Sequence, residues 1–186
     1  ASTDLDPYFL DPYYFGQAHL TWEGNMARET NTLLEKGSRY RDWDWNIPFY
    51  IGFNHFYFLQ NNEEGAVYLM ESSKRPGAPS LLPQLAARLM YKANRTENAV
   101  IFLQEILSIT DDENTKKMYG MRLNALKAIL FMEKAVDAYK SRFKDQPARL
   151  DELIARGIIK EIPKDPYGGK FYIDKDGSIK TTSELR

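Results

Sequence analysis

The chain has 186 residues and no cysteine, and hydrophobic residues make up 43% and charged residues 27% of it. This balance is that of a globular protein and not of a disordered one. The lack of cysteine excludes disulfides, thiol catalysis and zinc sites with cysteine ligands. The longest apolar runs fall far short of the roughly 20 residues that a helix needs to cross a bilayer.

The net charge of -1 conceals an uneven distribution along the chain. Residues 1–80 carry six basic and eleven acidic side chains, whereas residues 114–149 carry nine basic and three acidic ones. The basic stretch has few interleaved aromatic residues and no recognised nucleic-acid motif. We therefore interpret it as a solvated helix face and predict no nucleic-acid partner.

The first two thirds of the chain predict paired helices. Residues 1–12 are rich in Asp and Pro and indicate the entry into a helix near Tyr13, since Pro fits only the first turn of a helix. Turn signals at Gly24, at Asn61–Asn62 and at residues 75–79 then divide the apolar pattern. The expected helices cover residues 13–23, 25–41, 47–60, 63–74, 80–93 and 96–108.

These pairs repeat in sequence. Residues 50–73 match residues 83–106 when moved by 33 positions, and the second pair matches the first at a shift of 39. The six extra residues are placed at the Trp43-Asp44-Trp45 linker. A period of this length is typical of stacked supersecondary units, each of which buries its apolar face on its neighbours.

The pattern changes towards the C-terminus. Asp111-Asp112-Glu113 predicts the start of one long helix that runs to about Lys144 and closes the stack. After Gln146-Pro147 we expect a short helix that ends near Gly157 and a hairpin with strands at 171–173 and 179–182, turning at Asp176-Gly177. The predicted domains are therefore residues 1–144 and residues 145–186.

The helical units resemble tetratricopeptide repeats over about residues 7–110. The resemblance rests on a small residue early in each second helix, where two helices approach closely, and on Pro near the unit boundaries: Ala27, Ala66, Ala99, Pro7, Pro48 and Pro79. Family repeats usually carry Gly or Ala at their eighth position, where the second unit has Asn54 and the third Ala87. Such repeats bind through the inner face of their first helices, which implies the polar site residues Asn54, Gln84, Arg88 and Tyr91.

Two further resemblances concern cellular setting. The runs 43–53 and 75–79 are similar to a group of uncharacterised bacterial repeat proteins, commonly tethered to the inner membrane by an N-terminal helix. Residues 150–173 resemble the C-terminal segment of type II secretion major pseudopilins. Together they imply a bacterial envelope location at the periplasmic face of the inner membrane, with the cytoplasm as the alternative. Because the chain begins at Ala1, a signal peptide, anchor or repeat is expected to precede it, and membrane contact is expected only through such a segment.

Aromatic residues supply the other candidate site. Rings crowd the expected helix at 47–60, which therefore has apolar surface on more than one face. One interpretation is core packing between the first two repeats. The other is a groove in which aromatic side chains anchor a peptide, since aromatics and Arg dominate binding hot spots. The candidate anchors are Trp43, Trp45, Tyr50 and Tyr57.

Catalytic and metal patterns are weaker. His19 and Glu23 have the i, i+4 spacing of two ligands on one helix face, and with His55 they form the hypothesis of a metal-assisted hydrolase. No second ligand pair exists, so both histidines are interpreted as structural. The acidic pairs Asp42/Asp44 and Glu63/Glu64 lie where carboxylates cap helices and are solvated.

One acidic turn also resembles part of a calcium site. Residues 174–178 resemble the first half of a calcium loop, but position 12 counted from Asp174 is Leu185 instead of the required Glu. We interpret this segment as a hairpin turn, and any weak calcium binding would recruit Asp165. No cofactor is expected.

The sequence as a whole predicts a mainly α protein: a right-handed α-α superhelix of about three helix-turn-helix repeats, a long capping helix and a small C-terminal β-hairpin. We expect a non-enzymatic scaffold that binds a protein or peptide segment in the concave groove of the array. The alternatives are a structural self-assembly module, which would form homo-oligomers, and the metal-assisted hydrolase.

Overall fold

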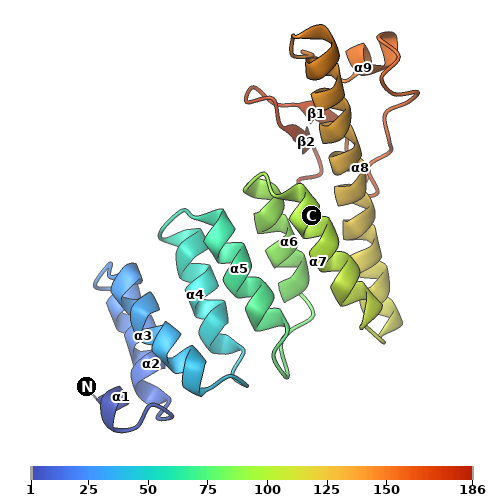
Figure 1. The fold of residues 1–186 in the computed structure, drawn as a ribbon. Coiled ribbons are helices and arrows are strands. Elements are labelled where there is room, and N and C mark those ends of the chain that lie inside the picture. The colour runs from blue at the N-terminus through green and yellow to red at the C-terminus, as the bar shows by residue number, and fades with distance from the viewer. Residues whose placement is uncertain (1, 186) are drawn as a thin grey trace. The chain divides into compact units, whose positions relative to one another are not determined.

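A computed structural model describes residues 2–185. Ala1 and Arg186, the outer ends of the two predicted domains, lie outside this range, as does the expectation about what precedes Ala1. The protein is mainly helical and ends in a two-stranded antiparallel hairpin (Figure 1). It divides into two compact units, Ala1–Ala93 (unit 1) and Asn94–Arg186 (unit 2). The predicted domain boundary after residue 144 falls inside unit 2.

Unit 1 consists of helices only in the part that the structure describes. In chain order they are α1 (Ser2–Leu5), α2 (Asp11–Phe15), the π-helix η1 (Gly16–Thr21) that continues α2, α3 (Ala27–Tyr40), α4 (Asn46–Tyr57), α5 (Asn62–Ser73) and α6 (Leu82–Lys92). All helices predicted in residues 13–93 are present. The π-helical turn was not predicted, because no apolar periodicity distinguishes it from an α-helix.

Polar residues make the turns between paired helices. Asn25 and Gln60 adopt left-handed backbone conformations, with φ angles of 52° and 53°. At the neighbouring Gly24 an added Cβ would lie 2.8 Å from the carbonyl oxygen of Leu20, so only glycine fits there. The Asn61 side chain then accepts a hydrogen bond from the Glu64 amide at 3.1 Å and caps α5.

The core of unit 1 lies where α2, α3 and α4 meet. Its centre is formed by Tyr13, Leu34, Ile47 and Ile51, which are fully buried. Next to it α4 and α5 approach so closely that a Cβ at Gly52 would lie 3.0 Å from the Gly65 carbonyl oxygen. The small residue at this close contact is Gly65, one position before the predicted Ala66, which is fully buried.

The two helices of the predicted third pair belong to different units. α6 packs against α5 within unit 1, whereas α7 (Thr96–Ser108) packs against α8 (Glu113–Phe143) within unit 2. The Asp112 carboxylate caps α8 by accepting from the Thr115 amide at 2.7 Å, and the helix ends at Lys144, whose φ is 58°. The prediction of one long helix after Glu113 is confirmed.

The C-terminal segment folds onto unit 2 as a short helix and a hairpin. α9 (Asp151–Ala155) precedes strands β1 (Phe171–Ile173) and β2 (Ile179–Thr181), in which Tyr172 is paired with Lys180. β2 packs against α8 and buries Ile179, so two strands that would be marginal alone are supported by a helix. Gly177 in the connecting turn has φ 82°, and the Asp174 amide donates to the Ser178 carbonyl at 2.8 Å, which confirms the predicted hairpin turn.

The close approach of α4 and α5 predicts that Gly52 does not tolerate a side chain. Gly52→Val should lower the free energy of unfolding by about 2–3 kcal/mol, because its methyl groups meet the α5 backbone and Leu69. The same substitution at Gly120, which has open space around it near the start of α8, should change stability by less than about 0.5 kcal/mol. Urea unfolding measures both, and equal losses at the two glycines would contradict the packing argument.

Candidate functional site

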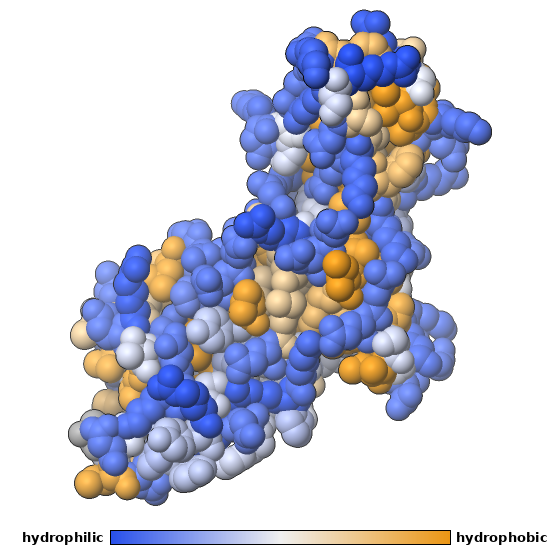
Figure 2. Space-filling model, in the orientation of Figure 1, coloured by the Kyte–Doolittle hydropathy of each residue, from blue (hydrophilic) through white to orange (hydrophobic). Residues whose placement is uncertain are grey.

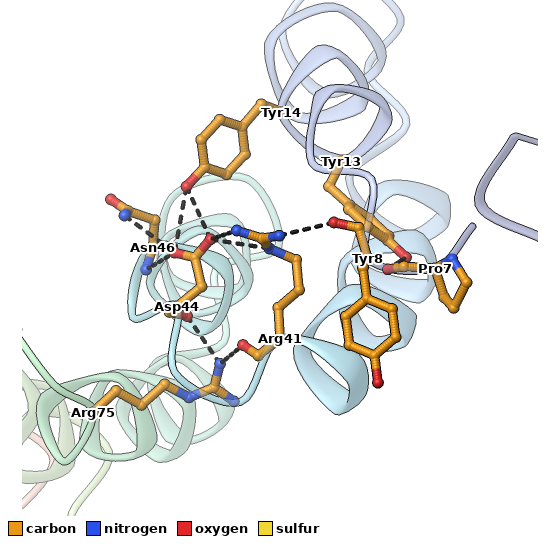
Figure 3. A network of polar contacts seen from close by, with 8 residues as sticks. All are labelled: Pro7, Tyr8, Tyr13, Tyr14, Arg41, Asp44, Asn46 and Arg75. Carbon is orange, nitrogen blue, oxygen red and sulfur yellow. Dashed lines mark hydrogen bonds and ion pairs between the residues drawn. The ribbon is translucent and has the colours of Figure 1, made fainter.

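Asp44 is the polar centre of the linker between the first two helix pairs (Figure 3). Its side chain is 8% exposed, and its Oδ1 accepts from the Asn46 backbone amide at 3.1 Å and the Asn46 Nδ2 at 3.2 Å. The hydroxyl of Tyr14, from α2, lies 3.4 Å from both carboxylate oxygens, and Arg41 Nη2 lies 3.4 Å from Oδ2. Asp44 thereby joins α2, the end of α3 and the start of α4.

Two arginines extend this cluster, as Figure 3 shows. Arg75, after α5, donates to the carbonyl oxygens of Arg41 and Asp44 at 3.0 and 2.9 Å. Arg41 in turn donates to the Tyr8 carbonyl oxygen at 2.8 Å. The linker where the sequence period breaks is thus a fixed polar junction, and it holds both the N-terminal residues and the start of α4 in place.

The candidate site lies beyond this junction, on the surface of α4. Phe49 and Phe53 line two adjoining pockets of about 310 and 330 Å³, which we call the aromatic groove. The first pocket is formed with side chains of α2 and η1, with Trp22 and with Tyr50 of α4. The second is formed mainly with side chains of α4 and α6: Phe56, Leu69, Leu85, Arg88, Leu89 and Lys92.

A cluster of rings forms the rim of the groove. The ring centroid of Trp22 lies 5.8 Å from that of Tyr57 and 6.1 Å from that of Phe53. Tyr57 stacks on Phe53 with a centroid distance of 5.4 Å and an interplanar angle of 11°. Trp22 and Tyr57 are 55% and 51% exposed, although neighbouring rings already fix them. Rigid, exposed aromatic surface of this kind anchors peptides at low entropic cost.

Buried amide side chains join the helices behind the first pocket. Asn54 Nδ2 donates to Gln17 Oε1 and to Asn31 Oδ1, both at 2.8 Å, and Gln17 Nε2 donates back to Asn54 Oδ1 at 3.0 Å. Gln17 also lines the first pocket. Three helices are joined by this network, so it fixes their spacing, and the Asn31 Nδ2 has no hydrogen-bond partner among the described residues.

The predicted site residues divide between the groove and other places. Tyr50 and Arg88 line the groove, Tyr57 lies in its ring cluster, and Trp45 contacts it through Phe49 at 6.0 Å. Gln84 is half-buried beside the lining residue Leu85 and lines neither pocket. The remaining three predicted residues are Trp43, Asn54 and Tyr91.

Three other predicted residues do not line the groove either, for identifiable reasons. Asn54 is fully buried, because its position faces Gln17 and Asn31, and Tyr91 is buried on α6. Trp43 stacks on Tyr8 at 6.3 Å instead. Phe49 and Phe53 belong to the ring-rich helix predicted at 47–60 but were not among the predicted anchors, and Trp22 and Lys92 were not predicted at all. The i, i+4 spacings of Phe49 with Phe53 and of Arg88 with Lys92 are the signals that could have found most of this set.

The histidines and acidic residues form no metal cluster. His19 Nδ1 lies 3.3 Å from Glu23 Oε2, whereas His55 stacks on Tyr68 at 5.6 Å and burial lowers its pKa. Asp165, in unit 2, accepts from the Tyr167 amide at 2.8 Å and from Ser183 Oγ at 2.6 Å, and these bonds tie the C-terminal turn to the hairpin. Across residues 2–185 no group of three or more metal-ligating side chains comes together.

Two half-buried tyrosines have strongly raised pKa values. Burial, followed by the nearby Asp44 carboxylate, raises the pKa of Tyr14 to about 12. Burial and the hydrogen bond to Glu35, at 3.0 Å, raise the pKa of Tyr68 to about 12. Both phenols therefore stay neutral in the folded protein well above their ordinary pKa of about 10.

Comparison with known proteins gives no relative: the chain matches no family model, no curated protein and no solved structure. Within the described residues, every helix is too short or too polar to span a membrane. The likenesses to tetratricopeptide repeats and to a pseudopilin tail stay predictions from the sequence.

The Asp44 junction gives a stability prediction. Asp44→Ala should lower the free energy of unfolding by about 2–4 kcal/mol, because the Arg41 guanidinium, the Tyr14 hydroxyl and the Asn46 amide lose their acceptor in a buried site. Asp42→Ala, at an exposed position two residues earlier, should stay within about 0.5 kcal/mol. Denaturant titration of both variants measures these losses, and comparable losses would contradict a stabilising role for the buried Asp44 carboxylate.

The tyrosine shifts predict loss of stability at alkaline pH. Between about pH 10 and 12 the unfolded chain releases the protons of Tyr14 and Tyr68 while the folded chain keeps them, so unfolding becomes easier as pH rises. Tyr14→Phe with Tyr68→Phe should flatten this part of the profile. Tyr172→Phe, which alters an exposed ring, should leave it unchanged. Unfolding midpoints measured from pH 8 to 12 provide the comparison.

Proposed function

We propose that this chain is a non-enzymatic scaffold that binds a protein or peptide segment in the aromatic groove. The observation that carries the proposal is the origin of the groove walls. Helices α2 and η1, α4 and α6 stand first in the three predicted pairs, and nearly every lining residue comes from them. A stack of repeats places equivalent helices on one face, where segments of a partner bind.

The chemistry of the walls supports a peptide ligand. Apolar and aromatic side chains dominate both pockets, and Gln17, Arg88 and Lys92 are the polar exceptions. Binding sites typically combine an apolar surface with a few placed polar groups that fix orientation. The Asp44 junction and the amide network hold α2, η1 and α4 in position, so the groove is preorganised and a ligand need not order it.

The finer form of the fold belongs to the same proposal. We propose that the pairs form a short right-handed α-α superhelix resembling tetratricopeptide repeats, and that α8 acts as its capping helix. Support comes from the 33-residue correspondence and from the buried Ala27, Ala66 and Ala99 near the starts of α3, α5 and α7. A bacterial envelope setting, with the cytoplasm as the alternative, is proposed from the resemblances alone.

Peptide selection tests the proposed function. A phage-displayed random peptide library panned on the protein should yield peptides that bind in the groove. Their dissociation constants should rise at least about tenfold on Tyr57→Ala and on Arg88→Ala, since each variant removes part of the ring cluster or the lining.

Tyr172→Ala provides the matched control, because it removes a ring that is 43% exposed, against 51% for Tyr57, from the hairpin of unit 2. Its affinity for the same peptides should equal that of the unaltered protein. Failure to enrich any peptide, or peptides that bind all three variants equally, would overturn the groove as the binding site.

A further inference from the structure

The N-terminal segment, Ser2–Asp11, exposes apolar side chains between carboxylates. Leu5 is 92% exposed, more than any other large hydrophobic residue that the structure describes, and Tyr8 and Phe9 are 53% and 46% exposed. The segment contains Asp4, Asp6 and Asp11 and no basic residue. Figure 2 shows hydrophobic side chains at the surface of the part of unit 1 that carries α1. An exposed apolar patch beside charged groups is typical of an interaction surface.

This segment is held in a defined conformation. Lys36 Nζ lies 2.5 Å from Asp4 Oδ1, and Asp6 Oδ1 accepts from the Tyr8 amide at 2.9 Å. The Tyr13 hydroxyl donates to the Pro7 carbonyl at 2.8 Å, beside the bond from Arg41 to Tyr8. Leu5 and Phe9 are therefore presented on an ordered turn, which lowers the entropy lost when they dock.

The aromatic groove has the complementary composition. Its second pocket offers about 330 Å³ between phenylalanine and leucine side chains, room for a projecting Leu or Phe. Arg88 and Lys92 lie one turn apart on α6 and give this pocket positive charge, and no acidic side chain is among the described residues that line it. Opposite charges at a docking surface speed encounter and select the partner.

We propose that the segment seated in the groove comes from a second copy of this chain. Leu5 or Phe9 of one copy fills the second pocket of the next, and the carboxylates beside it face Arg88 and Lys92. Each segment is tied to α3 and the Asp44 linker of its own chain. None of residues 2–11 is among the described residues that line either pocket, so segment and groove are different surfaces of one molecule. Such contacts close into a two-fold dimer when two copies exchange segments reciprocally, and otherwise form rings or open chains.

This inference rests on the proposed function of the groove, and two altered proteins test it. The donor variant, Leu5→Asp with Phe9→Asp, keeps the groove and loses the apolar segment. The acceptor variant, Arg88→Glu with Lys92→Glu, keeps the segment and reverses the charge of the groove. Light scattering over a concentration series at low salt should show mass growth beyond the monomer for the unaltered chain and monomers for each variant alone.

Mixing the two variants gives the decisive result. One intact segment and one intact groove remain in the mixture, so an equimolar mixture should form a dimer and nothing larger. That dimer also shows that the donor variant, which supplies the groove, is folded. The control variant, Lys117→Glu with Lys127→Glu on exposed positions of α8, should assemble like the unaltered chain. An unaltered chain that stays monomeric, or a mixture that does, overturns the inference.

A peptide of residues 2–11 separates this inference from the proposed function. It should bind the donor variant, lose at least about tenfold in affinity on the acceptor variant, and bind more weakly as salt rises. If library-selected peptides bind the groove and this peptide does not, the second copy is wrong and the groove function stands. If neither binds, both fall.

Discussion

The buried carboxylate of Asp44 is the constraint on which the first unit depends. It accepts from α2, from the end of α3 and from the start of α4. A charge that is 8% exposed is stable only when donors surround it, so the donors must meet at this point. The linker that interrupts the sequence period is therefore fixed. A turn without these bonds would allow several angles between the helix pairs.

The position of α4 then decides what the surface offers. This helix carries aromatic residues on several sides, and it buries Ile47 and Ile51 while Phe49, Phe53 and Tyr57 remain at the groove. Gly52 lets α5 approach on one side, and Asn54 joins α4 to Gln17 and Asn31 on the other. Core packing and an aromatic groove thus coexist on one helix, because different faces of it serve each.

In unit 2 a long helix supports a small hairpin. The apolar side of α8 buries Leu126, Ile129 and Met132, and β2 adds Ile179 against the same helix. Asp165 collects hydrogen bonds from Tyr167 and Ser183 and so fastens a loop with little apolar content. On α8, burial raises the pKa of Glu133, although the Thr96 hydroxyl donates to its carboxylate at 2.8 Å. This unit is held by one long helix and local polar contacts.

Helix positions followed from the sequence by itself, because apolar periodicity, capping residues and turn residues act over a few positions. The long helix after Glu113, the turn at Gly177 and the helices that bury Ala27 and Ala66 were all predictable in this way. The polar residues that face the interior were not predictable from the sequence. Asn54 and Asp44 read as exposed or capping residues in sequence, and only the packing of three helices around each turned them inward. The partition of the predicted third pair between two units was likewise decided by tertiary contacts, since local pattern carries no information about which neighbour a helix chooses.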